Sequence, residues 1–233
     1  MRSRFTSIAA LSFVLTVLHA NIVTAQQLVN FSVGAFVIRG EDARVDDDVL
    51  VANRELFKFD FKDFTGLSLN GEYLAPIGEY LEAGGGVGFT SRAVPTIYDQ
   101  YVRPDGTEID QELKLRTVPF TATVRLLPLG RQRAVQPYVG GGIGVISWRY
   151  SETGDFIDFS LASRPIFRAS YVNTGTAVGP VAVFGLRVPL GNAALGGEVR
   201  YQKAEADLDT RDFLASKIDL GGFHYMFTIG FRF

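Results

Sequence analysis

The sequence predicts an all-β fold: an eight-stranded antiparallel up-and-down transmembrane β-barrel, preceded by a cleavable signal peptide. Three observations predict it. An N-terminal segment has the features of an export signal, apolar residues repeatedly alternate with small or polar ones, and the connections alternate between short and long. Together they indicate a chain that is exported and then crosses a bilayer with strands.

Residues 1–25 have the order of parts found in a secretory signal peptide. These parts are a positive start at Arg2 and Arg4, an apolar run over 8–18, and compact residues before a cleavage site at Val23 and Ala25. The alternative, a membrane helix, needs about 20 apolar residues, more than this run provides. Cleavage after Ala25 leaves residues 26–233 as the barrel domain, and cleavage after Ala20 is the other option.

Composition excludes some sources of stability and some partners. The 233 residues include no Cys, so export through an oxidising compartment adds no disulfide. Loss of the two arginines of the signal peptide lowers the 23 basic residues to 21, against 25 acidic ones, which gives a net charge of −4. A nucleic-acid partner is therefore not expected, because nucleic-acid binding favours a basic excess.

The alternation is clearest at residues 223–233. Large apolar residues occupy the odd positions, and smaller or polar residues the even ones. The same period of two recurs over 29–37, 67–73, 81–89, 118–126, 139–145, 181–188 and 195–202. Each run has about the length of a tilted strand that crosses a bilayer. An even number of such strands closes with both ends on one side and satisfies every backbone hydrogen bond, as hydrocarbon requires.

The connections also alternate. Short ones are expected at 76–78, 128–136 and 189–192, and long ones at about 40–62, 92–112, 151–178 and 204–219. A soluble sandwich or lipocalin-like barrel, the alternative fold, predicts no such asymmetry. Residues 92–112 look like a hairpin whose strands project outward. Residues 151–178 are apolar for a loop, which indicates either strand extension above the membrane or a recognition surface.

With these features the chain resembles the small OmpA-type and OmpX-type outer-membrane β-barrels. The resemblance depends on the aromatic-terminated run 223–233, the glycine-rich runs 80–89 and 137–145, and Pro-containing turns. It implies the outer membrane of a Gram-negative-type bacterium, with membrane lipid and lipopolysaccharide as partners. It also implies a signal for the assembly machinery, carried by Tyr225, Phe227, Ile229, Phe231 and Phe233. No periplasmic peptidoglycan-binding domain is expected after the barrel.

Three motifs have a structural interpretation that we prefer to a functional one. The glycine runs continue the alternation, so they are expected to let a narrow barrel curve rather than to bind phosphate. His224 is followed two residues later by Met226, where the resembling lipid A deacylases have a Ser, so no enzyme and no cofactor are expected. The acidic run 46–48 is expected to be a solvated loop rather than a Ca²⁺ site.

The inward face of the predicted barrel carries acids and bases together. They are Glu72, Glu82, Arg125, Arg187, Glu198, Arg200 and Arg232. Because side chains fill an eight-stranded barrel and buried charges need partners, we expect an ion-pair network that plugs the lumen. The predicted function is a plugged structural or interaction scaffold that displays four extracellular loops to an unknown extracellular partner. The alternative is a narrow channel for small solutes, porin-like or for hydrophobic compounds.

Overall fold

The structure is a computed structural model and describes residues 27–233. The predicted signal peptide therefore lies outside the described residues. Eight long strands form one closed barrel in the order β1-β10-β7-β6-β5-β4-β3-β2, and every neighbouring pair is antiparallel. The eight-stranded antiparallel barrel predicted from the sequence is confirmed.

The strands differ greatly in length. They are β1 (Leu28–Ile38), β2 (Gly66–Ile77), β3 (Leu81–Val102), β4 (Glu108–Leu126), β5 (Gln136–Ile157), β6 (Ile166–Leu190), β7 (Ala193–Gln202) and β10 (Gly222–Arg232). The remaining elements are short: η1 (Glu41–Ala43), α2 (Val49–Arg54), η2 (Phe61–Phe64), β8 (Glu205–Asp207) and β9 (Lys217–Asp219). Within residues 27–233, no helix is long and apolar enough to cross a membrane.

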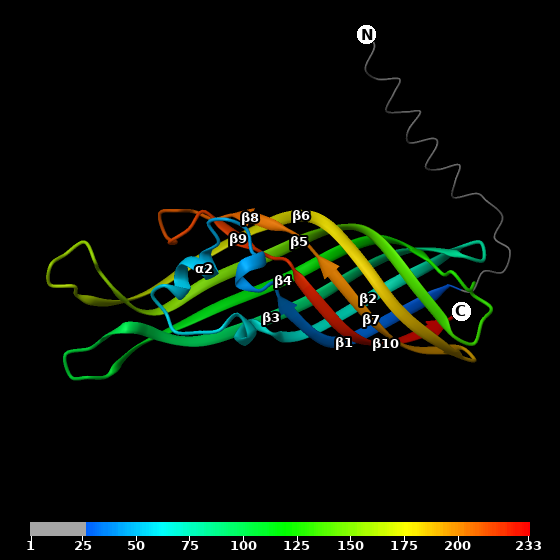
Figure 1. Ribbon diagram of the computed structural model, residues 1–233, viewed down its shortest axis with the longest axis horizontal. Helices are drawn as coiled ribbons and strands as arrows, with labels where there is room; N and C mark the ends of the chain where they lie inside the picture. Colours follow the sequence, from blue (N-terminus) through cyan, green and yellow to red (C-terminus); the bar gives the residue numbers. More distant parts are fainter. Residues whose placement is uncertain (1–26) are drawn as a thin grey trace, which may run out of the picture.

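The first and last strands close the barrel. Leu28 pairs with Arg232, and Gln27 and Phe233 exchange backbone hydrogen bonds of 3.0 and 3.1 Å. The start of the described chain and the C-terminus therefore lie at one end of the barrel, beside the short turns, as an even strand number requires (Figure 1). We call this the termini end and the opposite one the hairpin end.

In the part of the barrel nearer the termini, the residues predicted to face outward do so on every strand. On β10, the odd-numbered residues from Phe223 to Phe231 are exposed on the outside, while His224, Met226 and Thr228 are buried inside. The other seven strands repeat this arrangement. The outer surface is thus apolar and the inner surface polar, the reverse of a water-soluble barrel.

The structure corrects two of the four predicted long connections. Strands β3 and β5 each have 22 residues and β6 has 25, so they continue well past a bilayer crossing. Only 103–107 and 158–165 connect them, and the rest of 92–112 and 151–178 is strand. The projecting hairpin expected at 92–112 and the strand extension considered for 151–178 are both present (Figure 1).

The other two long connections fold over the hairpin end. Residues 39–65 carry helix α2, and residues 203–221 carry the small β8–β9 sheet. The expectation of a solvated acidic run at 46–48 is wrong for Asp48, which is buried. Its carboxylate caps α2 by accepting hydrogen bonds from the backbone N–H of Leu50 and Val51, at 3.0 and 3.3 Å.

Candidate functional site: the barrel interior and its closure

The interior at the level of the apolar outer surface is a charged layer of four side chains from three strands. Arg125 on β4 donates to Glu72 on β2 and, at 2.8 Å, to Glu198 on β7. Arg200 on β7 donates to Glu198 at 2.8 Å and lies 3.6 Å from Glu72. The layer contains two acids and two bases, so its formal charge is zero.

A second cluster lies nearer the termini end. Arg187 on β6 pairs with Glu82 on β3 at 2.8 Å and donates from Nε to Gln136 at 3.0 Å. Arg232 donates to the same Gln136 oxygen at 3.2 Å rather than to a carboxylate. The structure therefore brings the seven predicted charged residues together in two groups, with six of them in ion pairs and Arg232 held by an amide.

Sequence reasoning missed two members of these clusters. Tyr138 donates its hydroxyl to Glu198 at 2.9 Å, and its ring lies 4.7 Å from the Arg125 guanidinium carbon. Gln136 links Arg187 to Arg232. Strand alternation predicts the inward position of both residues. Val139 faces outward, so residues 136 and 138 on the same strand face the lumen. Both residues are uncharged, whereas the predicted network consists of charged residues only.

The charged layer is almost completely shielded from solvent. Arg125 is 1% exposed, Glu198 2% and Tyr138 3%. An unpaired ion at such a depth costs several kcal/mol, in order of magnitude, so the close pairing is what makes this burial possible. The contacts of Arg125 also join strands that are not neighbours in the barrel, which fixes how the wall closes.

His224 lies one layer further towards the hairpin end and is buried. Its Nδ1 lies 2.8 Å from the Ser68 hydroxyl, and its Nε2 lies 3.3 Å from the Gln202 side-chain oxygen. Met226, on the same face, accepts a contact from Asn70 rather than offering a nucleophile. The ring is thus held by neutral hydrogen-bonding partners, as expected of a structural lumen residue.

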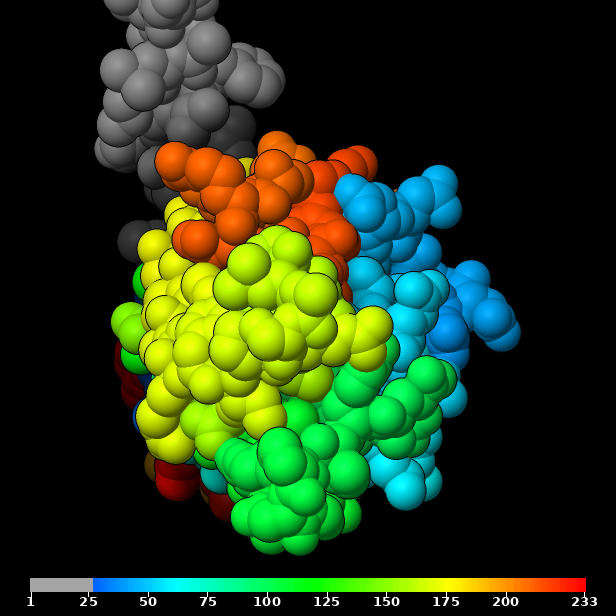
Figure 2. All heavy atoms as spheres, turned by 90° about the vertical axis from the view of Figure 1, so that its left-hand side faces the viewer, coloured from blue at the N-terminus to red at the C-terminus, as the bar shows by residue number. Residues whose placement is uncertain are grey.

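Beyond His224 the interior changes character and becomes a hydrophobic core. It is built from inward side chains of the extended strands and from the two folded connections, and includes Phe36, Val49, Leu50, Phe57, Leu113, Trp148, Tyr150, Phe213, Ile218 and Leu220. Figure 2 shows the hairpin end covered by 39–65, 203–221 and the tips of the two long hairpins, with no opening visible. The mouth of the barrel is therefore closed by protein.

Two polar contacts hold helix α2 in this core. Asn53 donates to the Glu152 carboxylate at 2.6 Å and to the Tyr150 hydroxyl at 2.9 Å, and the same hydroxyl lies 2.9 Å from Glu152. Burial raises the pKa of the Glu152 carboxyl above its ordinary value, and the two hydrogen bonds oppose that change. No basic side chain of the described residues pairs with Glu152.

A separate buried network ties the two folded connections to each other. Arg44 pairs with Asp48 through Nε at 2.7 Å and Nη2 at 3.0 Å, and also donates to the carbonyl of Asp219 at 2.8 Å. Asp219 donates its backbone N–H to Asp48 at 2.6 Å and pairs with Arg39 at 2.8 Å. Residues 39–65 and 203–221 thus form one closure of the barrel.

The outside of the barrel carries an apolar belt. Outward residues such as Phe31, Leu69, Phe120, Phe184 and Phe227 are 44–62% exposed. The five residues of the predicted assembly signal belong to this belt on β10 or at its end, and their role in assembly stays a prediction. A closed antiparallel barrel with such a belt, of a length suited to hydrocarbon, is an outer-membrane-type barrel that contacts lipid.

Among residues 27–233, no group of three or more His, Asp or Glu side chains is placed to hold a metal ion. Two residues of the acidic run 46–48 bind protein groups instead. Asp47 accepts hydrogen bonds from Ser216, and Asp48 is paired with Arg44. The site therefore consists of paired charges and a hydrophobic core.

The chain is similar to solved structures of small outer-membrane proteins. Ail of Yersinia pestis, in complex with a heparin analogue, is 16% identical over 90% of this chain and 99% of that one, with a TM-score of 0.42. Neisserial surface protein A is 12% identical over 89% and 97%, with a TM-score of 0.47. A major outer membrane protein of Thermus thermophilus is 16% identical over 90% and 99%, with a TM-score of 0.43. No protein-family model matches the chain, and no curated protein sequence matches it.

Proposed function

We propose that this outer-membrane barrel is a closed scaffold whose lumen does not conduct and whose long hairpins present a surface outside the cell. The observation that carries the proposal is a double seal. The charged layer around Arg125 fills the barrel at membrane level, and the hydrophobic core under α2 fills it beyond. A conducting path needs continuous water, and both layers exclude it.

The hairpin tips support a role in interaction. At the β3–β4 and β5–β6 tips, buried Tyr98 supports Tyr101, which packs edge to face with exposed Phe159. The exposed Arg164 places its guanidinium 5.5 Å from the Tyr101 ring. Aromatic and arginine side chains on a rigid support are typical of protein recognition surfaces. The proposal includes no catalysis, because His224, the single histidine of the described residues, and the Ser68 hydroxyl beside it are both buried in the lumen, out of reach of a substrate.

Single-channel recording of the mature chain in planar bilayers tests the closed lumen. We expect no discrete conductance steps from the wild type. Glu198→Ala with Arg200→Ala keeps the charge balance of the layer but empties the space that two long side chains fill. It is expected to introduce unstable openings and, through the cavity, to lower resistance to urea. Asp209→Ala with Arg211→Ala, an exposed ion pair on 203–221, is the matched control and should resemble the wild type.

Reproducible steps from the wild type would disprove the closed lumen and favour the second candidate, a narrow solute channel. One observation favours that candidate: Thr121 Oγ1 and Arg125 Nε are buried in the interior without a hydrogen-bond partner, as groups along a water path would be. If the lumen variant changes neither conductance nor stability, the charged layer neither plugs the lumen nor controls a solute path through it.

A further inference from the structure

The outward surface of β4, β5 and β6 changes from apolar to polar at one level. On β4 the belt ends at Val118 and Arg116 follows, and on β5 it ends at Val145 and is followed by Ser147. The paired strands place Val118 opposite Ser147. Side chains just beyond a hydrocarbon-facing belt lie among the lipid headgroups.

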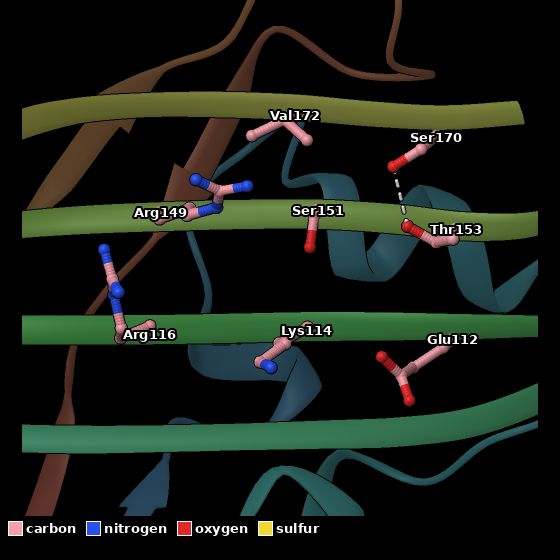
Figure 3. A pocket seen from close by; sticks show the side chains of 8 residues that line it. All are labelled: Glu112, Lys114, Arg116, Arg149, Ser151, Thr153, Ser170 and Val172. Carbon is pink, nitrogen blue, oxygen red and sulfur yellow. Dashed lines mark hydrogen bonds between the residues drawn. The ribbon is translucent and has the colours of Figure 1, made fainter.

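A shallow groove of about 360 Å³ begins at this level on the outer wall. Its lining consists of Glu112, Lys114, Arg116, Arg149, Ser151, Thr153, Ser170 and Val172. Figure 3 shows Arg116 extending from β4 towards the strand that carries Arg149, with Lys114 beside them. Thr153 and Ser170 hydroxyls are 2.8 Å apart and close the far end of the groove.

The two arginines have an unfavourable arrangement in the protein alone. Arg116 and Arg149 are direct cross-strand partners on the same outer face. Like charges placed opposite each other across a ladder destabilise the pair. Neither they nor Lys114 has an acidic side chain within 4.0 Å among the described residues. Glu112, on the same face of β4, lies two positions from Lys114 and four from Arg116, about 7 and 13 Å at the usual rise of a strand.

An anion between the two guanidinium groups would remove this repulsion. Guanidinium groups bind phosphate through paired N–H donors, and the Ser151 hydroxyl and the Lys114 ammonium offer further donors beside them. The site opens sideways into the headgroup region rather than into free solution. A phosphate attached to lipid is therefore the ligand that matches both the charge and the position.

We propose that Lys114, Arg116 and Arg149 form a binding site for a phosphorylated lipid headgroup of the outer leaflet, of the kind that lipopolysaccharide carries. The site depends on the membrane placement of the barrel and is independent of whether the lumen conducts. It gives the β4–β6 wall a specific headgroup neighbour just beyond the belt, which itself faces the acyl chains.

Lipid titration of the full mature protein, purified from expressing membranes into phosphatidylcholine nanodiscs, tests the site. The probes are lipopolysaccharide and the same material after removal of its lipid A phosphates. We expect the wild type to bind the phosphorylated form at least about tenfold more tightly, a difference of about 1.4 kcal/mol. Arg116→Gln with Arg149→Gln should abolish this preference, and Arg116→Lys with Arg149→Lys should retain part of it.

Lys58→Gln with Arg133→Gln removes the same charge at exposed positions away from the groove and should behave as the wild type. Retained mobility shift on heating shows that each variant is folded. Equal binding of the two lipid forms, or loss of preference in the control variant, would overturn the site. Displacement by millimolar inorganic phosphate or by a soluble sulfated polysaccharide would assign the arginines to a free anion and overturn the lipid assignment.

Discussion

At the scale of single residues, Arg125 holds the charged layer together. It contacts two carboxylates, Glu72 and Glu198, and its guanidinium lies over the Tyr138 ring. Removal of a partner from a buried ion pair is far more damaging than removal of the whole pair, because the remaining charge keeps its desolvation penalty. The layer is therefore sensitive to charge balance more than to the identity of any one residue.

Arg125→Met is expected to lower the free energy of unfolding by about 3–5 kcal/mol, since it leaves two buried acids with one base. Addition of Glu72→Gln restores one acid and one base, Glu198 and Arg200, and should recover most of that loss. Urea unfolding in lipid, followed by fluorescence of Trp148, the single tryptophan, measures both. A double variant no more stable than Arg125→Met would contradict the charge-balance argument.

Glu152 gives the closure a pH dependence. Its pKa is raised in the folded protein because of burial, so the folded state holds its proton to higher pH than the unfolded state does. Glu152 therefore contributes its full stability at pH values below its pKa in the unfolded state. This contribution decreases as the pH rises through its pKa in the folded state. As the pH rises above the ordinary value of this carboxyl, loss of the proton therefore increasingly weakens the attachment of Asn53 and α2.

Glu152→Gln is expected to slow hydrogen exchange of the α2 amides at neutral pH, because the amide oxygen still accepts from Asn53 and Tyr150 and has no proton to lose on unfolding. The difference from wild type should shrink as the pH is lowered towards 4.5, the ordinary value for this carboxyl. Glu112→Gln, on the outer face of β4, is the control and should have no effect at either pH. A pH-independent gain would show that charge is not the cause.

At the scale of elements, the glycine-rich run of β5 sets how closely two strands approach. A Cβ at Gly142 would lie 1.9 Å from the backbone oxygen of Ala122 and 2.8 Å from the Cα of Thr123, both on β4. At its neighbour Gly141 the nearest atom would be 3.5 Å away. The strand therefore needs glycine at one of two adjacent positions, which supports the curvature interpretation over a phosphate loop.

Gly142→Ala is expected to cost about 3 kcal/mol, the upper part of the range for overpacking, because both atoms it meets belong to a backbone held in the ladder. Gly141→Ala is the matched control and should change stability by no more than about 0.5 kcal/mol. The fraction of protein that refolds to the heat-modifiable form reports both. Equal refolding of the two variants would refute the close-approach argument.

The four longest strands, β3 to β6, each pass through two environments, the membrane and the extension beyond it. On β4, Phe120 faces lipid while Thr121 faces the lumen, but further along Leu113 and Leu115 face inward and Lys114 faces out. The apolar side of the strand thus changes from outside to inside at the end of the belt. In a sequence such a change looks like the end of a strand, which is why the sequence predicts connections at 92–112 and 151–178.

At the scale of the whole molecule, the barrel has a membrane part with a polar interior and an extension with a hydrophobic interior. The extension is packed as a water-soluble domain is, with apolar side chains inside, and residues 39–65 and 203–221 cover its end. Its position at the end opposite the termini fits the arrangement of outer-membrane-type barrels, in which short turns face the periplasm and long connections face out.

Cysteine labelling checks this orientation cleanly, because the chain has no cysteine of its own. A membrane-impermeant maleimide applied to intact cells should label Ala162→Cys, at the β5–β6 tip, nearly completely. Ala134→Cys, in the turn before β5, should stay at background until the outer membrane is permeabilised. Both alanines are exposed, so accessibility in the protein does not distinguish them. The reverse labelling pattern would show that the barrel is inserted in the opposite orientation.

The sequence by itself determined the strand number, the phase of each membrane strand, the short turns and the seven charged lumen residues, because these follow from a local period of two. It could not decide which of Glu72, Glu82 and Glu198 meets which arginine, nor that Tyr138 and Gln136 join them, because partners come from strands far apart in the chain. Only the tertiary structure showed that residues 39–65 and 203–221 fold together, through contacts of Asp48, and close the hairpin end of the barrel. Their apolar residues follow no long repeat, and their burial depends on the extended strands that receive them.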